Sequence, residues 1–126
     1  MKNVLTLTLA ATLMATLTGC ESSQTATSST AKETKTYKVA VVKQLDHASL
    51  DEIAKAICDE FDAISEKEGV KIEYGDVYSG QNDQTVLQQI ASQVTSEGVD
   101  AIVPVATLAA QTMTVASDGT VPVVFA

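Results

Sequence analysis

The chain contains one histidine, and two of its neighbours could take part in proton transfer. His47 follows Asp46 and stands two residues before Ser49, so a serine nucleophile with a histidine base is one chemistry to consider. The segment lacks the strand-to-helix elbow that exposes a nucleophilic serine, and no carboxylate is placed to orient the imidazole. Capping of the following helix by Asp46 or Ser49 is the favoured interpretation, which leaves His47 free to line a pocket.

A second polar segment, residues 106–111, reads ATLAAQ and opens a predicted helix. Its free backbone N–H groups and the Thr107 hydroxyl could bind a carboxylate or another anion. Plain N-capping by Thr107 explains the same residues, and the two roles can coexist. The segment is therefore both a helix start and a candidate anion site.

Other motifs that would carry chemistry are missing from the sequence. The six glycines form neither a G-x-G-x-x-G nor a G-K-[ST] loop, so nucleotide binding is unsupported. One histidine and one available cysteine cannot make up a typical zinc site. The net charge of −8 and the lack of arginine argue against nucleic acid as a partner. We expect no catalytic residue, no metal and no cofactor.

The elements that must position these residues follow from the hydrophobic pattern. Strands are predicted over residues 38–43, 70–78, 101–105 and 121–125, and helices over 48–68, from the capping candidates Asn82 and Asp83 to near Gly98, and over 108–117. This alternation predicts an α/β fold with a doubly wound parallel sheet. Pro104 removes a backbone donor, so the third strand should end at or near it.

A sheet of this kind binds ligands beyond the carboxyl ends of its strands, where the strand order reverses. In the flavodoxin-like order 2-1-3-4-5, that crevice lies between the first and third strands. Residues 44–49 and 106–111 follow those two strands. Both segments are therefore the expected borders of a ligand site.

The first twenty residues have the layout of an export signal, with Lys2 as a basic start and an apolar run over residues 4–17. The sequence LTGC, ending at Cys20, resembles the lipobox of bacterial lipoproteins, in which the cysteine thiol receives a diacylglycerol before cleavage. An ordinary secreted protein with a chance cysteine is the alternative. We expect residues 1–19 to be removed, Cys20 to be lipidated, and residues 20–36 to form a flexible tether.

The second cysteine, Cys58, then has no partner for an intramolecular disulfide. It belongs to an apolar stripe at helical spacing, and Gly69 supplies a C-cap signal for that helix. The stripe consists of Leu50, Ile53, Ala54, Ile57, Cys58, Phe61 and Ile64. Core packing is therefore the expected role of Cys58, rather than that of a reactive thiol.

Four stretches carry a more specific resemblance: VAVVKQLDHASLDEIAKAICDEF, YSGQNDQTVLQQIASQ, VDAIVPVATLAAQTM and VPVVFA. With the lipobox, they resemble the substrate-binding lipoproteins of ABC transporters, of the periplasmic-binding-protein-like type I superfamily and the tryptophan or tyrosine group. The resemblance implies that residues 37–126 form an N-terminal lobe. In that family an aspartate and further loops follow the V-F motif, so we expect this lobe to be incomplete, the second lobe to be absent, and a single lobe to bind weakly.

The resemblance also implies a site and partners. The residues that would face the cleft are Gln44, Asp46, His47, Asn82, Thr107, Ala109 and Gln111. The implied function is capture of a small solute, an aromatic amino acid, and its delivery to ABC permease and ATPase subunits. The protein would work without catalysis, held by its lipid anchor at the extracytoplasmic face of the cell membrane.

Three alternatives stay open. A sugar or nucleoside could be the ligand, although such clefts stack aromatic side chains on rings and the two bordering segments contain none. An extracytoplasmic hydrolase on the same scaffold would need His47. A lipoprotein with only an interaction role would need no pocket.

Overall fold

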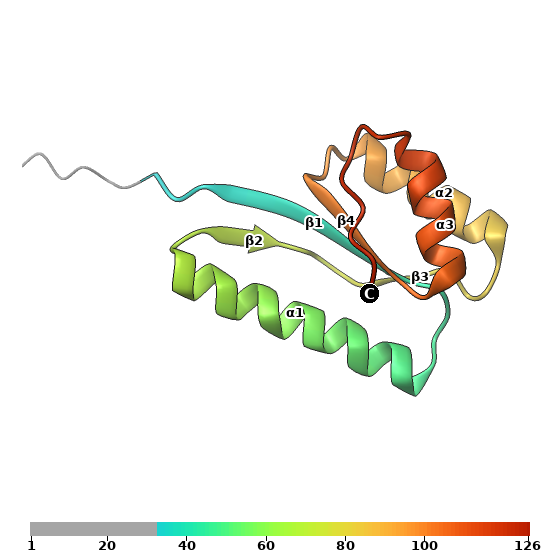
Figure 1. The fold of residues 1–126 in the computed structure, drawn as a ribbon, viewed down its shortest axis with the longest axis horizontal. Coiled ribbons are helices and arrows are strands. Elements are labelled where there is room, and N and C mark those ends of the chain that lie inside the picture. The colour runs from blue at the N-terminus through green and yellow to red at the C-terminus, as the bar shows by residue number, and fades with distance from the viewer. Residues whose placement is uncertain (1–32) are drawn as a thin grey trace, which may run out of the picture. The chain divides into compact units, whose positions relative to one another are not determined.

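The first strand, β1 (Thr36–Lys43), lies in the middle of the sheet and has partners on both edges (Figure 1). The computed structural model describes residues 33–126. Ala40, Val41 and Val42 are buried at consecutive positions of β1, so both faces of the strand are covered. Consecutive apolar residues are typical of a parallel strand enclosed by helices on both sides.

One edge of β1 pairs with two short parallel strands, β2 (Lys71–Glu73) and β3 (Tyr78–Ser79). The sequence predicts a single strand over residues 70–78, so this prediction is only partly right. The chain leaves the ladder between the two strands, where Gly75 adopts a φ of 56°. A left-handed residue cannot continue an extended strand, and the break follows from it.

The other edge of β1 pairs in parallel with β4 (Ala101–Val105), over the full length of β4. The strand passes through Pro104, opposite Val42, and ends at the next residue, Val105, so the prediction that it ends at or near Pro104 is confirmed. The N–H groups of Ile102 and Ala106 donate to the C-terminal segment, so the nitrogen of Pro104 faces the same way, away from β1. Proline therefore costs no hydrogen bond between β1 and β4.

Residues 121–126 run parallel to β4 on its far side. Val124 N donates to Ile102 O at 2.9 Å, and Ala126 N donates to Pro104 O at 3.1 Å. Only the pair Ile102 and Val123 forms a regular bridge, since Pro104 has no N–H to offer at the next position. The predicted fourth strand is thus an extended, irregularly bonded segment, and the segments lie in the predicted order second, first, third and fourth.

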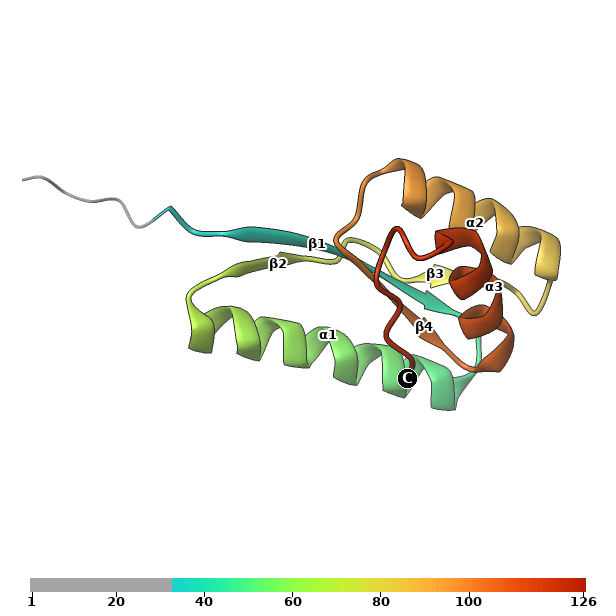
Figure 2. The same cartoon turned by 45° about the horizontal axis from the view of Figure 1, so that its top comes forward.

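Helices cover both faces of the sheet (Figures 1 and 2). The helix α1 (Ala48–Glu68) packs on the side of Val41, with Ala54 and Val105 in a small buried cluster. The helices α2 (Gln84–Ser96) and α3 (Thr107–Ser117) pack on the side of Ala40 and Val42. Successive residues of a strand point to opposite faces, so the chain is the predicted doubly wound α/β fold.

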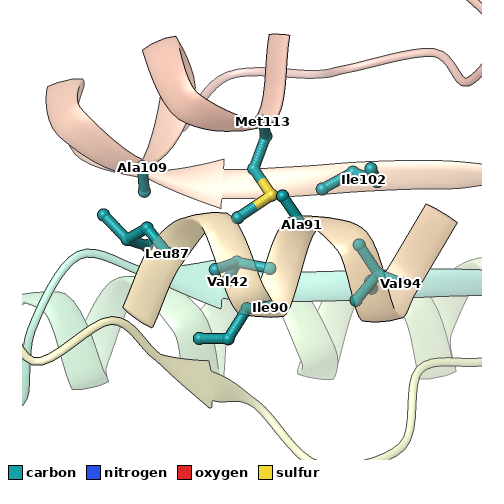
Figure 3. Packing of buried hydrophobic residues seen from close by; sticks show 9 residues of the cluster. Val42, Leu87, Ile90, Ala91, Val94, Ile102, Ala109 and Met113 are labelled. Carbon is teal, nitrogen blue, oxygen red and sulfur yellow. The ribbon is translucent and has the colours of Figure 1, made fainter. Parts of the chain in front are cut away.

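The larger core lies between β1, β4 and the pair α2 and α3. Figure 3 shows Met113 reaching from α3 toward Ala91 of α2. The buried residues of this larger core are Ala40, Val42, Leu87, Ile90, Ala91, Val94, Ile102, Ala109 and Met113. This cluster fixes α3, and with it the segment that follows β4.

The apolar stripe of α1 packs against the sheet as predicted, but solvent reaches more of it than the prediction implies. Cys58 is a free thiol that packs against the smaller cluster, and burial is the main cause that raises its pKa. Gly69 caps the helix in the left-handed conformation, as predicted, with a φ of 64°. Ile53 is 40% exposed, so one margin of the stripe faces solvent.

Candidate functional site

The carboxyl ends of β1, β3 and β4 meet at one edge of the sheet. The segments that follow them are residues 44–47, 80–83 and 106–111, and two of these were predicted to border the crevice. Gln44 N donates to Val105 O at 3.1 Å, which extends the β1 and β4 ladder by one residue. The two segments that the switch-point argument selected therefore lie together at one edge of the sheet.

Gln44 connects all three segments through its side chain. Its Oε1 accepts a hydrogen bond of 2.9 Å from Leu108 N, at the start of α3. Its Nε2 donates to Asn82 Oδ1, also at 2.9 Å, in the turn before α2. Two residues that the family resemblance placed at the cleft, Gln44 and Asn82, are thus brought together.

The turn before α2 lies tightly against Gln44. Asn82 N donates to Gln44 O at 2.8 Å, and Gly80 N donates to Lys43 O at 2.9 Å. A Cβ on Gly80 would lie 3.0 Å from Gln44 O and 2.3 Å from Leu87 Cδ2. Only glycine fits this position, so the close approach of the two segments depends on it.

Asp83, rather than Asn82, is the N-cap of α2. One carboxylate oxygen of Asp83 accepts from Thr85 N at 2.7 Å and from Val86 N at 3.1 Å. Of the two predicted capping candidates, one therefore caps the helix. The other, Asn82, is left to contact Gln44.

The start of α3 differs from its prediction. The N-cap is Ala106, which makes no side-chain hydrogen bond, and Thr107 is the first helical residue. The prediction of capping by Thr107 is therefore wrong: a cap must precede the helix in extended conformation, and Thr107 is already helical. Ala106 has φ 77° and ψ 162°, a conformation that is almost confined to glycine, so the junction between β4 and α3 is strained.

An ion-pair cluster fixes the segment after β1. Lys43 Nζ lies 2.8 Å from Asp46 Oδ1 and also bonds to Asp51, while only 14% of the Lys43 side chain is exposed. The hydrogen bonds that Lys43 donates to Asp46 and then to Asp51 raise the pKa of Lys43, and the Lys43 ammonium lowers the pKa of Asp46. Ser79 also lowers the Asp46 pKa, although its buried hydroxyl does not reach hydrogen-bond geometry with it. Asp46 is therefore engaged by Lys43.

His47 is the N-cap of α1, so the prediction that Asp46 or Ser49 caps this helix is wrong. The His47 Nδ1 accepts from Ser49 N at 3.3 Å, and Asp46 is turned to Lys43 instead. The hydrogen bond between His47 and Ser49 uses the serine backbone, which leaves a nucleophile and base pairing without support. His47 is exposed, and it does not line the hollow described below.

Ala109 and Gln111 point in different directions from α3. Ala109 is fully buried in the larger core, so the expectation that its side chain faces the crevice is wrong. Gln111 is exposed and lines a hollow of about 600 Å³ between α3 and residues 121–126. Ala106, Thr107, Ala110, Gln111, Thr114, Val115, Phe125 and Ala126 surround this hollow.

Sequence reasoning missed Phe125. The ring is 66% exposed and lies at the carboxyl end of the segment beside β4, against the hollow. The switch-point argument considered only the first and third strands, although the fourth strand ends at the same edge. The apolar Phe125 at the carboxyl end of the predicted fourth strand was the feature of the sequence that could have identified it.

Within residues 33–126, no group of histidine, cysteine and acidic side chains could hold a metal ion. None of the helices in that same range is long and apolar enough to cross a membrane. Lipidation of Cys20, the signal and most of the tether fall outside the described residues.

A family model for ABC transporter substrate-binding proteins matches residues 38–126. This match extends over most of the chain and includes every element of the sheet. The chain belongs to this family. Proteins of the family are extracytoplasmic, bind solutes and are generally non-enzymatic.

Three solved structures resemble this ABC transporter substrate-binding family member. One, described as an ABC domain in complex with L-Trp from Streptococcus pneumonia, is 30% identical with a TM-score of 0.61 and covers 73% of the chain. A conserved domain protein from Vibrio cholerae is 33% identical with a TM-score of 0.63 and covers 72% of the chain. A ligand-free, open substrate-binding protein with adhesive properties from Clostridium difficile is 26% identical, with a TM-score of 0.53 and 71% coverage.

The chain spans only 30% of the length of each of these neighbours. No relative was found among curated proteins. The match of the family model therefore establishes the family, while the solute and the partner proteins are proposed below.

Proposed function

We propose that this chain captures a small solute, an aromatic amino acid, and delivers it to an ABC permease. The observation that carries the proposal is the hollow of about 600 Å³ beside the start of α3, at the edge where the strands end. This volume lies within the range of about 300–1,000 Å³ that is typical of small-molecule sites. The L-Trp complex of one structural neighbour favours the amino-acid class.

The carboxylate of the amino acid would bind at the first turn of α3. The positive end of a helix dipole and the unused N–H groups of its first turn attract an anion. Gln44 already occupies the N–H of Leu108, so we assign the carboxylate to the hydroxyl and N–H of Thr107. Thr107 is exposed and borders the hollow, as this role requires.

The side chain of the solute would lie in the hollow, against Phe125 and the apolar atoms of Ala110 and Val115. Gln111 stands at the same wall and could bond to a polar group such as an indole N–H. Contacts from one lobe bury one side of a ligand. Tight binding would therefore require further contacts on the opposite side, as in a pair of lobes that close over the solute.

The exposed ring of Phe125 also favours a second candidate. An aromatic side chain at the hollow could stack on the ring of a sugar or nucleoside, which the two segments identified from the sequence could not provide. A ligand test must therefore include both classes.

For membrane placement, we propose lipidation of Cys20 and a tether from Cys20 to the start of β1 at Thr36. An anchored binding domain stays close to the permease that it serves. The acidic chain has no basic cluster for anionic lipid, so acyl chains are the proposed means of attachment.

Calorimetric titration of the full chain tests the solute class. L-Tryptophan, L-tyrosine and L-phenylalanine should release heat, whereas glucose and adenosine should not. Gln111→Ala should weaken binding of the amino acid. Gln89 is an exposed glutamine of α2 outside the hollow, so Gln89→Ala should leave this binding unchanged. Heat with adenosine or glucose but none with the aromatic amino acids would replace the first candidate by the second.

A further inference from the structure

We propose that Gln44 is a positioning residue of this site: it holds the start of α3 and the turn before α2 in one arrangement, without contacting the solute. The inference rests on the proposed function, because the held segments carry Thr107 and Asn82. It also departs from the family resemblance, which places Gln44 among the residues that face the ligand.

The first argument is that every polar group of Gln44 has a partner within the protein. Its N–H donates to Val105 O and its carbonyl oxygen accepts from Asn82 N. Its side-chain Oε1 and Nε2 bond to Leu108 and Asn82, respectively. Gln44 does not line the hollow, and both ends of its amide bond to other segments, so the side chain is positioned to orient those segments.

The second argument comes from the start of α3, which has no cap of its own. Ala106 offers no side-chain acceptor, and its φ of 77° holds the junction in a strained conformation. The acceptor for Leu108 N comes instead from Gln44, 64 residues earlier in the chain. Strain of this kind persists only where surrounding contacts hold it, and this bond is such a contact.

The third argument concerns the direction of the hydrogen bonds. A backbone N–H can only donate, so Leu108 requires the oxygen of the Gln44 amide. The Gln44 amide nitrogen must then face Asn82, whose own oxygen is turned toward it. One amide therefore sets the orientation of a second amide at the crevice.

Amide proton exchange, followed by NMR in the full chain without ligand, tests the proposal. Gln44→Met keeps the length of the side chain but loses both hydrogen bonds, so exchange at Leu108 should become about three- to tenfold faster. Gln44→Glu keeps an acceptor for Leu108 and should restore slow exchange there. Val94, in the buried face of α2, should exchange at an unchanged rate in both variants.

Three outcomes would overturn the proposal. The first is slow Leu108 exchange in Gln44→Met, and the second is faster exchange at Leu108 and Val94 alike, since a general loss of stability would produce it. The third is unchanged L-tryptophan affinity in Gln44→Met. A wild-type chain that binds no tryptophan would count against the proposed function alone, because the exchange measurement without ligand still decides the role of Gln44.

Discussion

Gly80 lies so close to Leu87 that a Cβ on the glycine would stand 2.3 Å from Leu87 Cδ2 and 2.5 Å from Leu87 Cγ. Leu87 is fully buried in the core between the sheet and α2. Gly80 N also bonds to Lys43 O, so the glycine cannot move away without losing contact with β1. The close packing of α2 beside the end of β1 therefore depends on the lack of a side chain at Gly80.

Gly80→Ala should lower the free energy of unfolding by about 2–3 kcal/mol, because the added methyl must displace Leu87 or the main chain. Urea unfolding followed by circular dichroism measures this loss. Gly98→Ala is the matched control: its φ is 67°, but nothing lies within 4 Å of its Cβ position. It should cost about 1 kcal/mol, from the backbone conformation alone. Equal losses in the two variants would contradict the close contact.

Ala106→Gly should stabilise the chain by about 1 kcal/mol. Relief of the strained conformation contributes about 1–3 kcal/mol, and the greater freedom of glycine in the unfolded chain offsets part of it. Ala110→Gly, one turn further along α3, should instead destabilise by about 1 kcal/mol, as expected within a helix. Thermal unfolding of the two variants would show shifts of opposite sign. A lower melting temperature for Ala106→Gly would contradict the strained junction.

Local pattern predicted the regular elements well. The predicted bounds of α1 and β4 agree with the structure, because an apolar stripe closed by Gly69 and a run of buried residues are local signals. The sequence does not predict the break between β2 and β3, since Gly75 fits equally well into an extended segment. A glycine permits a left-handed conformation without requiring it, and tertiary context decides.

The candidate site was harder to predict, because its contacts join distant segments. The cap of α3 comes from Gln44, and rules that search for a cap just before the helix could not find it. Phe125 reaches the hollow only because the fourth strand ends beside the third. Topology alone predicted that residues 44–49 and 106–111 lie at the same edge of the sheet, but the side-chain partners there depend on the three-dimensional packing.

Lys43→Met should reduce the pH dependence of stability. In the wild type, Lys43 lowers the pKa of Asp46 below 3.8, so the folded state gains stability above that pH and loses it as the pH falls through the lowered value. The raised pKa of Lys43 contributes stability below 10.5, which is lost as the pH rises through the raised value. Without the Lys43 ammonium, the loss of stability at low pH and the loss at high pH should both become smaller.

Urea unfolding at pH 7, 3 and 11 measures this change. Lys55→Met is the control, since Lys55 pairs with Asp59 on the exposed side of α1, where both side chains are more than half exposed. An exposed pair of this kind contributes little to stability. If Lys43→Met and Lys55→Met behave alike between pH 7 and pH 3, the cluster around Lys43 has no special role.

Cys58 should react slowly with iodoacetamide at pH 8. The thiolate is the reactive form, and burial, followed by the neighbouring Asp62, raises the pKa of this thiol above its ordinary value of 9.0. Unfolding in urea should restore the rate of a free cysteine. Rapid alkylation of the folded chain, measured by mass spectrometry, would contradict the packing of Cys58 against the smaller core.

Cys20→Ala should abolish incorporation of labelled palmitate and release the protein from washed bacterial membranes, because the proposed acyl acceptor is the Cys20 thiol. Two or three acyl chains anchor a protein stably, whereas a single chain binds only marginally. Cys58→Ala tests the specificity of labelling, since it removes the other cysteine and should leave both labelling and membrane attachment intact. Membrane attachment that survives Cys20→Ala would show that the uncleaved N-terminal segment, rather than a lipid, holds the protein.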